Sequence, residues 1–230
     1  MFRLDQPTII TIDGPAGTGK SSVARMLARR LGLDFLDTGA MYRAAALVAL
    51  REGLDPADPV ALVPRVVDAD IRFDWSLDPP EVLVFGEPEA RAIRSPAVTA
   101  IVSQVAGIRA LRTHLVERQR DIARKHPRLV SEGRDQGSVV FPNAPVKFYL
   151  DASAAVRAAR RARQLRDAGQ PADEARLLDE IIARDRSDMG RADGPLVCPA
   201  DAVLVDTSTL EFNGVVDELE RIVRRRAAEP

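Results

Sequence analysis

The sequence predicts an α/β fold centred on a five-stranded parallel sheet that is flanked by helices. Residues 8–12, Thr-Ile-Ile-Thr-Ile, form a short run rich in β-branched side chains, which is typical of a strand buried on both faces. A glycine-rich turn follows, and the apolar residues between Ser21 and Leu31 then recur on one face of a helix that Gly32 ends. A strand, a loop and a helix in this order open a βαβ unit.

Four further segments have the length and apolar content of buried strands, and each is neighboured by a helical pattern. They are Asp34 to Asp37, Leu129 to Glu132, Val146 to Leu150 and Ala202 to Asp206. Together with residues 8–12 they supply the five strands of the predicted sheet. We also expect a closing helix around Val215 to Arg226, with one apolar side that packs on the protein.

A segment from about 64 to 96 interrupts this alternation, and we interpret it as an insertion. Ile71 to Trp75 and Val82 to Phe85 are strand-like, and the turn Leu-Asp-Pro-Pro lies between them, which indicates an antiparallel hairpin. A long helical stretch follows from Pro96 to His126, with a break at Gly107. The apolar stripe of this stretch is typical of a helix that faces the core.

The residues from about 157 to 190 have the pattern of a mobile lid. Arg157 to Arg166 is a basic helical stretch, the polar segment 167–171 breaks it, and a second helix follows. A chain of 230 residues with 46% hydrophobic content is long enough for one sizeable core. The simplest interpretation is a single domain from 1 to 230 that carries the insertion and the lid.

The composition argues against several kinds of partner. The 33 basic and 34 acidic residues nearly cancel, so the broad positive field needed for sequence-independent binding of nucleic acid is absent. No stretch reaches the roughly 20 apolar residues that span a bilayer. We therefore expect a cytoplasmic monomer whose partners include neither nucleic acid nor a membrane. Cys198, the only cysteine, is expected to be a small buried side chain.

The turn after the first strand fits the P-loop pattern, a glycine and four free positions followed by Gly-Lys-Ser or Gly-Lys-Thr. Glycines let consecutive backbone N–H groups point at phosphate oxygens, and the following helix adds its positive N-terminal end. We expect Lys20 to reach the β- and γ-phosphates of ATP, and Ser21 to offer its hydroxyl to Mg²⁺, with Asp13 or Asp37 acting through water. The residues expected to hold ATP in this turn are Gly14, Pro15, Ala16, Gly17, Thr18, Gly19, Lys20, Ser21 and Ser22.

A P-loop indicates a nucleoside triphosphate, but both kinases and hydrolysing switches use one. Guanine-binding switches carry Asn-Lys-x-Asp, and none of the three lysines of this chain stands in such a segment. Arginines instead follow two of the predicted strands, in segments 37–43 and 132–137, where open α/β sheets place their ligands. This arrangement favours phosphoryl transfer between two anions over hydrolysis.

A third polar cluster lies within residues 184–191. The spacing of Arg184, Asp188 and Arg191 puts two arginines and an aspartate on one face of a predicted helix. An exposed stripe of ion pairs explains this cluster as well as a ligand site does. His114 and His126 fall in the polar helix before Pro127, and we expect both to be surface residues rather than catalysts.

Taken together, these segments resemble the bacterial cytidylate kinases, which belong to the P-loop nucleoside monophosphate kinases. The resemblance runs from residue 9 to about residue 207, and it is carried by Thr11 to Pro15 with the P-loop, Asp37 to Arg43, Ser103 to Ala106, Glu132 to Asp135, Arg184 to Arg191 and Ala200 to Ala202. It implies a P-loop kinase with an acceptor-binding insertion and a mobile lid. It also implies direct in-line transfer of the γ-phosphoryl group of ATP to CMP or dCMP, giving CDP or dCDP and ADP, with Mg²⁺ and arginine charge stabilisation.

The resemblance implies roles for individual residues as well. Those that would hold the acceptor phosphate are Thr38, Arg43, Arg134 and Arg191. Those that would read the cytosine are Ser103, Arg112 and Asp135, and those for the ribose are Arg184 and Asp188. The lid residues over ATP would be Arg157, Arg160 and Arg161, and the catalytic residues would be Lys20, Arg134, Arg191 and Arg157. Thr38 stands where a serine is common in the family and keeps the hydroxyl, whereas Phe85 to Pro88 departs from the family's turn and receives no role.

Two alternatives stay open at this point. One is a P-loop kinase for another small acceptor, such as adenylate, uridylate, shikimate or dephospho-coenzyme A. The other is a nucleotide-binding module without transfer activity. The acceptor-side segments argue against both. The favoured reaction needs no general base, because the second pKa of a monophosphate, about 6, leaves it largely dianionic at pH 7.

Overall fold

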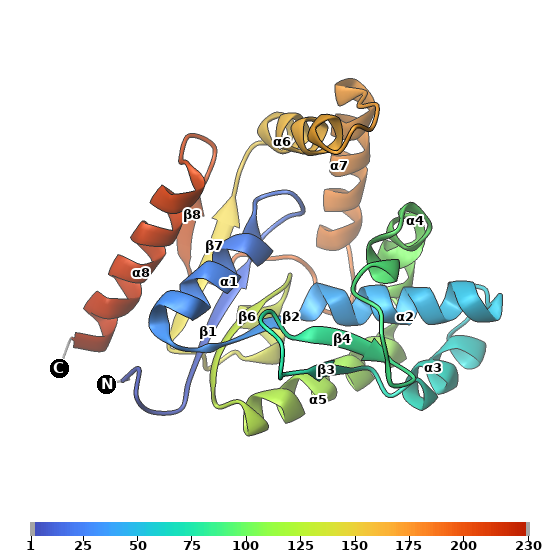
Figure 1. Cartoon of the computed structure of the whole chain (residues 1–230), viewed down its shortest axis with the longest axis horizontal. Coiled ribbons are helices and arrows are strands. Elements are labelled where there is room, and N and C mark those ends of the chain that lie inside the picture. The colour runs from blue at the N-terminus through green and yellow to red at the C-terminus, as the bar shows by residue number, and fades with distance from the viewer. Residues whose placement is uncertain (1–2, 229–230) are drawn as a thin grey trace. The chain divides into compact units, whose positions relative to one another are not determined.

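The computed structural model describes residues 3–228, whose helices and strands are drawn in Figure 1. These residues divide into two compact units. The first unit joins residues 3–34 to residues 127–228, and the second unit is Phe35 to His126. The chain therefore leaves the first unit once and returns to it once. Whether the whole chain acts as the single domain that the sequence suggests, with an insertion at 64–96 and a lid at 157–190, stays a prediction.

The predicted five-stranded parallel sheet is confirmed. Its order is β2-β6-β1-β7-β8, and the chain passes from the first unit into the second within β2. The strands are β1 (Thr8–Asp13), β2 (Asp34–Asp37), β6 (Arg128–Glu132), β7 (Val146–Asp151) and β8 (Val203–Asp206). β1 lies between β6 and β7 and pairs in parallel with both, and its Ile10 and Ile12 side chains are fully buried. This position explains why β1 is apolar on both faces.

The register of the sheet brings the ends of β1 and β6 together at one edge. Ile12 lies opposite Glu132 on one side and opposite Phe148 on the other. Because the strands are parallel, the turns that follow β1 and β6 leave the sheet at the same edge, the edge where α/β proteins bind their ligands. The P-loop follows β1 there, and residues 133–137 follow β6.

Four helices and one short turn complete the first unit. They are α1 (Lys20–Leu31), α6 (Ala154–Asp167), α7 (Glu174–Met189), α8 (Phe212–Ala228) and the π-helical turn η2 (Gln136–Val140). α1 packs on β6 and on α8, with Leu27 of α1 and Leu219 of α8 completely buried. α6 and α7 pack against each other (Figure 1). The predicted closing helix is thereby confirmed, together with its apolar side.

The second unit combines helices with a small antiparallel sheet. Its elements are α2 (Thr38–Glu52), α3 (Pro59–Asp68), β3 (Arg72–Asp74), β4 (Glu81–Val84), β5 (Glu87–Pro88), the 3-10 turn η1 (Ala92–Arg94), α4 (Pro96–Val105) and α5 (Arg109–Lys125). The predicted hairpin corresponds to β3 and β4, and the predicted break in the long helical stretch separates α4 from α5. α2 contacts both α4 and α5, and its Ala44 to Ala46 are completely buried.

Three expectations need correction. The hairpin has a third strand, because Phe85 (φ 53°) and Gly86 (φ 83°) turn the chain back so that Leu83 faces Pro88. α7 ends at Met189, so Arg191 follows the helix instead of lying on its face. Cys198 is exposed, because it lies in the irregular segment between α7 and β8, where no helix or strand covers it. Within residues 3–228, no helix is long and apolar enough to cross a membrane.

Candidate active site

The P-loop joins β1 to α1, and its glycines adopt backbone conformations that other residues rarely accept. Gly14 has φ 144°, Gly17 has φ 85° and Gly19 has φ 87°. A Cβ atom on Gly14 would lie 2.0 Å from the carbonyl oxygen of Leu150, so the loop passes β7 more closely than any side chain allows. The chain thus forms the left-handed turns that aim backbone N–H groups toward a bound anion.

Lys20 is the first residue of α1, and its side chain folds over the P-loop. Its Nζ donates to the carbonyl oxygen of Pro15 at 2.6 Å and lies 3.5 Å from Oγ1 of Thr18. Burial, helped by the positive charge of Arg134, lowers the pKa of Lys20 to about 7. Lys20 is therefore held inside the loop, where a bound triphosphate would favour the charged form of its amine.

Ser21, the next residue, is tied to the end of β6. Its Oγ donates to Oε1 of Glu132 at 2.6 Å, and Glu132 is buried. A hydroxyl and a carboxylate beside a phosphate-binding loop are oxygen ligands of the kind that Mg²⁺ prefers. The residues present therefore fit the expected metal: Ser21 would be its direct ligand, and Glu132 lies next to Ser21.

The turn after β6 is bound to the end of β1. We call residues 133–137 the acceptor turn, because they include Arg134 and Asp135, two residues expected to bind the acceptor nucleotide. The carboxylate of Asp13 accepts from the backbone N–H of Gln136 at 2.9 Å and from that of Gly137 at 2.7 Å. Burial raises the pKa of Asp13 to about 6, although these two hydrogen bonds oppose the shift.

Two arginines expected at the acceptor phosphate share one aspartate. Nε of Arg134 donates to Oδ2 of Asp188 at 2.9 Å, and Arg191 donates to Oδ1 of the same residue. Asp188 is the one fully buried residue of α7 and lies next to its last residue. Burial alone would raise the pKa of Asp188, but the charges of Arg134 and Arg191 outweigh it and lower that pKa, with help from Arg184. The carboxylate is thus kept ionised and holds a cluster of positive charge together.

Arg157 links α6 to the P-loop and to α7. Its side chain is buried, and Nη1 donates to the carbonyl oxygen of Ala16 at 2.9 Å. The same guanidinium binds Asp185 through two hydrogen bonds, of 3.1 and 2.5 Å. This is the paired geometry in which arginine and a carboxylate interact most strongly. Arg157 therefore reaches the phosphate-binding loop from the lid segment.

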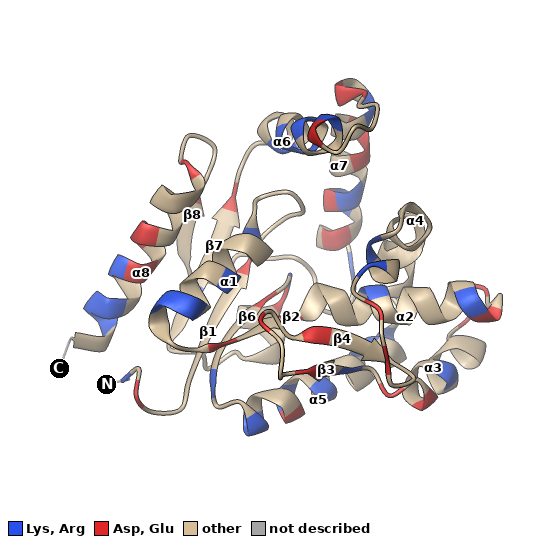
Figure 2. Cartoon of the chain, viewed as in Figure 1, with Lys and Arg blue, Asp and Glu red and all other residues tan. Residues whose placement is uncertain are grey.

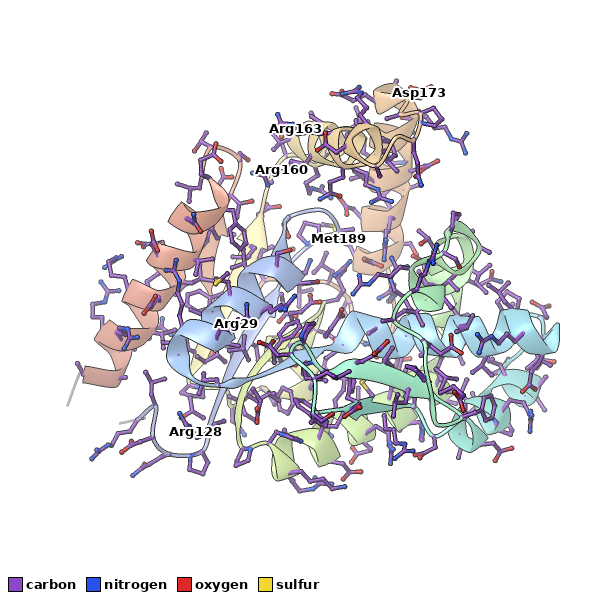
Figure 3. All side chains as sticks on the ribbon, in the orientation of Figure 1. Arg29, Arg128, Arg160, Arg163, Asp173 and Met189 are labelled. Atoms are coloured by element: carbon purple, nitrogen blue, oxygen red, sulfur yellow. The ribbon has the colours of Figure 1, made fainter. Side chains whose placement is uncertain are left out.

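The other two expected lid arginines are placed differently. Arg160 donates to the hydroxyl of Thr207 at 3.1 Å and to the carbonyl oxygen of the same residue, on the stretch that follows β8 (Figure 3). Arg161 is exposed, and its Nη1 lies 3.5 Å from Oε1 of Gln164. α6 is largely basic, while α7 carries both signs of charge (Figure 2). The structure thus brings only Arg157 of this trio to the P-loop.

The second unit holds four of the expected acceptor residues. Thr38 is buried at the start of α2, and Arg43 of the same helix donates to the carbonyl oxygen of Ile93 at 3.2 Å and to Thr99 at 2.9 Å. Ser103 is half-buried on α4. Arg112 of α5 is buried, donates to the carbonyl oxygen of Ala106 at 3.2 Å, and lies 5.4 Å from the centre of the Tyr42 ring. These four side chains thus come from α2, α4 and α5, and α2 contacts each of the other two helices.

Comparison with known proteins matches these features to one family. The family model described as cytidylate kinase matches residues 10–225 of the chain. The chain belongs to the cytidylate kinase family. The cytidylate kinase of Rhodococcus opacus (strain B4) is 48% identical over 223 residues, which cover 95% of this chain and 96% of that protein. The one from Nocardia farcinica (strain IFM 10152) is 46% identical over 222 residues, covering 96% of each.

A likeness to a solved structure concerns the fold alone. The crystal structure of an uncharacterized protein from Eubacterium ventriosum matches with a TM-score of 0.50 at 12% identity, and the match covers 96% of this chain and 99% of that one. Membership of the cytidylate kinase family confirms that the chain is a P-loop kinase, as the sequence predicted.

In this member of the cytidylate kinase family, the first unit unites most of the expected site. It contains the P-loop residues, Arg134, Asp135, Arg157, Arg184, Asp188 and Arg191. The second unit contains Thr38, Arg43, Ser103 and Arg112. Within the first unit, the hydrogen bonds described above join the P-loop, the acceptor turn and α7 into one network. The roles of these residues in a cytidylate kinase stay proposals.

The sequence assigned no role to Glu132 or Asp185, and for Asp13 it suggested only contact with Mg²⁺ through water. Glu132 holds Ser21, Asp185 holds Arg157, and Asp13 holds the acceptor turn. A signal was present for Glu132, because it immediately precedes Gly-Arg-Asp at the end of a predicted strand. Asp185 lies among alternating charges on α7, where an exposed ion pair was an equally good explanation. Asp13 stands directly before the P-loop, and its acidity at that position was the available clue.

Proposed function

We propose that this enzyme transfers the γ-phosphoryl group of ATP to CMP or dCMP, giving ADP and CDP or dCDP. The observation that carries the proposal is the direct attachment of the acceptor turn to the P-loop strand, in a chain of the cytidylate kinase family. An attachment of this kind supports a fixed distance between the residues that hold the donor and those that hold the acceptor. Such alignment is the main requirement of phosphoryl transfer.

The reaction exchanges one phosphorus–oxygen bond for another. An oxygen of the acceptor phosphate attacks the γ-phosphorus of ATP, and the bond between that phosphorus and the bridging oxygen of ADP breaks. The acceptor phosphate is already largely dianionic at pH 7, since its second pKa is about 6, so no side chain has to remove a proton. The protein contributes alignment and neutralisation of charge.

Lys20 stabilises negative charge on the migrating group, because its ammonium is held inside the P-loop. Arg134 and Arg191 are gathered by Asp188, and their planar guanidinium groups suit the oxygens of the acceptor phosphate. Arg157 lies against the loop from the lid side. Ser21, supported by Glu132, would hold the Mg²⁺ that arrives with ATP. When bound, that ion neutralises charge on the β- and γ-phosphates.

The remaining assignments rest on the family. Thr38 and Arg43 contribute to binding the acceptor phosphate, and Ser103 and Arg112 act with Asp135 in reading the cytosine. Arg184 acts with Asp188 on the ribose. Each of these roles predicts a loss of affinity for the acceptor, with little change for ATP, when the side chain is truncated.

A coupled assay of ADP formation tests the proposal. With ATP and Mg²⁺, we expect high kcat/KM for CMP and dCMP and much lower values for UMP, AMP and GMP. Transfer to AMP, UMP, shikimate or dephospho-coenzyme A in preference to CMP would show that the proposed acceptor is wrong. ATP binding without any transfer would reduce the protein to a nucleotide-binding module. Light scattering of the purified 25.1 kDa chain tests the proposed monomer in the same preparation.

A further inference from the structure

Asp13 is a buried carboxylate, and the charge of Lys20 offsets only a small part of the cost of burying it. It is the last residue of β1, directly before Gly14 of the P-loop, and only 1% of its surface is exposed. Each of its two oxygens accepts one hydrogen bond: Oδ1 accepts from the N–H of Gln136, and Oδ2 accepts from the N–H of Gly137. Burying a charge is costly, and the raised pKa of Asp13 reflects that cost. A carboxylate at this position therefore needs a reason other than stability.

The acceptor turn is fitted to β1 from its own side as well. A Cβ atom on Gly137 would lie 2.9 Å from Oγ1 of Thr11, 3.1 Å from Cδ of Lys147 and 3.3 Å from Oδ2 of Asp13. The φ angle of Gly137 is not positive, so the backbone conformation does not require glycine at this position. Glycine is needed because there is no room for a side chain. A side chain there would push the turn away from Asp13.

Two more hydrogen bonds hold the ends of the same turn. The N–H of Gly133 donates to the carbonyl oxygen of Ile12 at 3.0 Å, and the hydroxyl of Ser131 donates to the side-chain oxygen of Gln136 at 2.8 Å. The turn is thus anchored before Arg134 and after Asp135. Arg134 and Asp135 lie between these two hydrogen bonds. The bonds therefore fix the backbone positions from which both side chains extend.

We propose that Asp13 is a positioning residue that couples the P-loop to the acceptor turn, fixing Arg134 and Asp135 relative to Lys20. The inference rests on the proposed function, because these two residues matter for turnover only if they bind the acceptor. The hydrogen bonds of the carboxylate run to the turn. The carboxylate acts through two backbone N–H groups, and a displacement of about 1 Å in such an aligned site can cost as much as 100-fold in rate.

The first test is Asp13→Asn, which keeps the shape but turns one acceptor into an N–H donor that faces a backbone N–H. We expect kcat/KM for CMP to fall about 10- to 100-fold. The KM for ATP and the Mg²⁺ concentration for half-maximal rate should stay within roughly twofold. The matched control is Asp58→Asn, because Asp58 also accepts from two backbone N–H groups, those of Val60 and Ala61, at the start of α3. That control should leave all these values unchanged.

A double-mutant cycle separates positioning from a general loss of structure. If Asp13 acts through Asp135, Asp13→Asn combined with Asp135→Ala should lower kcat/KM for CMP by clearly less than the product of the single effects. Effects that multiply both with Asp135→Ala and with Arg134→Ala would overturn the inference. So would a loss that falls on ATP or on the Mg²⁺ requirement, since Asp13 would then belong to the metal side of the site.

Gly137→Ala provides a second route should Asp13→Asn fail to fold. It should also raise the KM for CMP and speed amide hydrogen exchange at Gln136, while Gly214→Ala, whose added Cβ meets nothing within 4 Å, serves as its control. Unchanged CMP kinetics in a folded Gly137→Ala protein would contradict the inference. Failure of the proposed function is distinguishable, because the wild-type enzyme would then show no transfer to CMP or dCMP at all.

Discussion

Single residues of the first unit place charge in the interior of the protein. Lys20, Asp13, Arg157 and Asp188 are all nearly inaccessible to water, and each binds a backbone group or an opposite charge. Electrostatic interactions are stronger in such surroundings than in water. The same surroundings make each of these charged groups costly to bury. Buried ionisable groups of this kind are common at active sites.

The first prediction concerns Lys20→Ala. We expect a folded protein whose transfer rate is lower by about 10² to 10³, since one electrostatic donor of this kind is typically worth roughly 3 to 4 kcal/mol. Steady-state kinetics with saturating ATP and CMP, beside a circular-dichroism check of folding, measures the effect. Near-native turnover in the variant would remove the P-loop mechanism.

The second prediction concerns Asp135→Ala. Cytosine offers an amino donor and an unprotonated ring nitrogen, and a site built to pair such groups rejects an analogue by as much as 10⁴-fold. We expect kcat/KM for CMP to fall by a factor that corresponds to about 2 kcal/mol or more of lost transition-state stabilisation. The ratio of CMP to UMP activity should narrow, and the affinity for ATP should stay nearly intact. If discrimination survives, or if ATP binding is lost instead, Asp135 belongs to the donor side.

A pH dependence of stability follows from Asp13. Its pKa is raised in the folded protein from 3.8 to about 6, so between these values the folded state holds a proton that the unfolded state has released. The contribution of Asp13 to the free energy of unfolding therefore falls as pH rises from about 4 to about 6, and it is constant above. The melting temperature of Asp13→Asn minus that of the wild type should rise over this window. A flat difference would show that the pKa is not shifted.

Among the elements, α6 and α7 are joined by the ion pair of Arg157 and Asp185, and Arg157 also donates a hydrogen bond to Ala16 of the P-loop. Arg157 of α6 and Asp185 of α7 are buried or nearly so, whereas Arg176 and Glu180 form an exposed pair on α7 with side chains 78% and 56% accessible. Exposed pairs contribute little to stability, and buried ones are costly to break. The buried pair can therefore be tested by mutation, with the exposed pair as its control.

We expect Asp185→Asn to weaken the packing of α6 on α7 and to raise the KM for ATP, because Arg157 would lose the partner that aims it at the loop. Charge-assisted hydrogen bonds of this kind are worth roughly 1.5 to 3 kcal/mol. Hydrogen exchange in α6 and α7, with the KM for ATP, provides the measurement. Glu180→Gln should change neither quantity, and equal effects from both variants would deny Arg157 its role.

At the scale of the whole molecule, two compact units share one chain that crosses between them at residues 34–35 and 126–127. A kinase that admitted water to an aligned γ-phosphate would hydrolyse ATP without transfer. We expect the lid of about 157 to 190 and the hairpin of β3 and β4 to close when both nucleotides are bound.

Small-angle scattering and hydrogen exchange check this closure. CMP together with a non-hydrolysable ATP analogue should reduce the radius of gyration and protect amides in α6, α7 and the β3–β4 hairpin more than either nucleotide alone. Unchanged scattering and exchange with both nucleotides bound would show that the protein does not close.

The fold and the P-loop could be predicted because their signals are local. The strand before the P-loop, the spacing of its glycines and Lys20, and the apolar faces of α1 and α8 depend on residues within a few positions of one another. Each of these patterns has only a few structural solutions, so sequence alone determined the parallel sheet, the P-loop and the segments that carry the family resemblance.

Only the tertiary structure decided which side chains meet. Ser21 binds Glu132 across 111 positions, Gly137 binds Asp13 across 124, and Arg157 binds Ala16 across 141. No periodicity connects residues so far apart, and a chain with many arginines offers many equally plausible partners. The exposure of Cys198 and the end of α7 before Arg191 were decided in the same way, because burial and helix ends depend on what the rest of the chain packs against them.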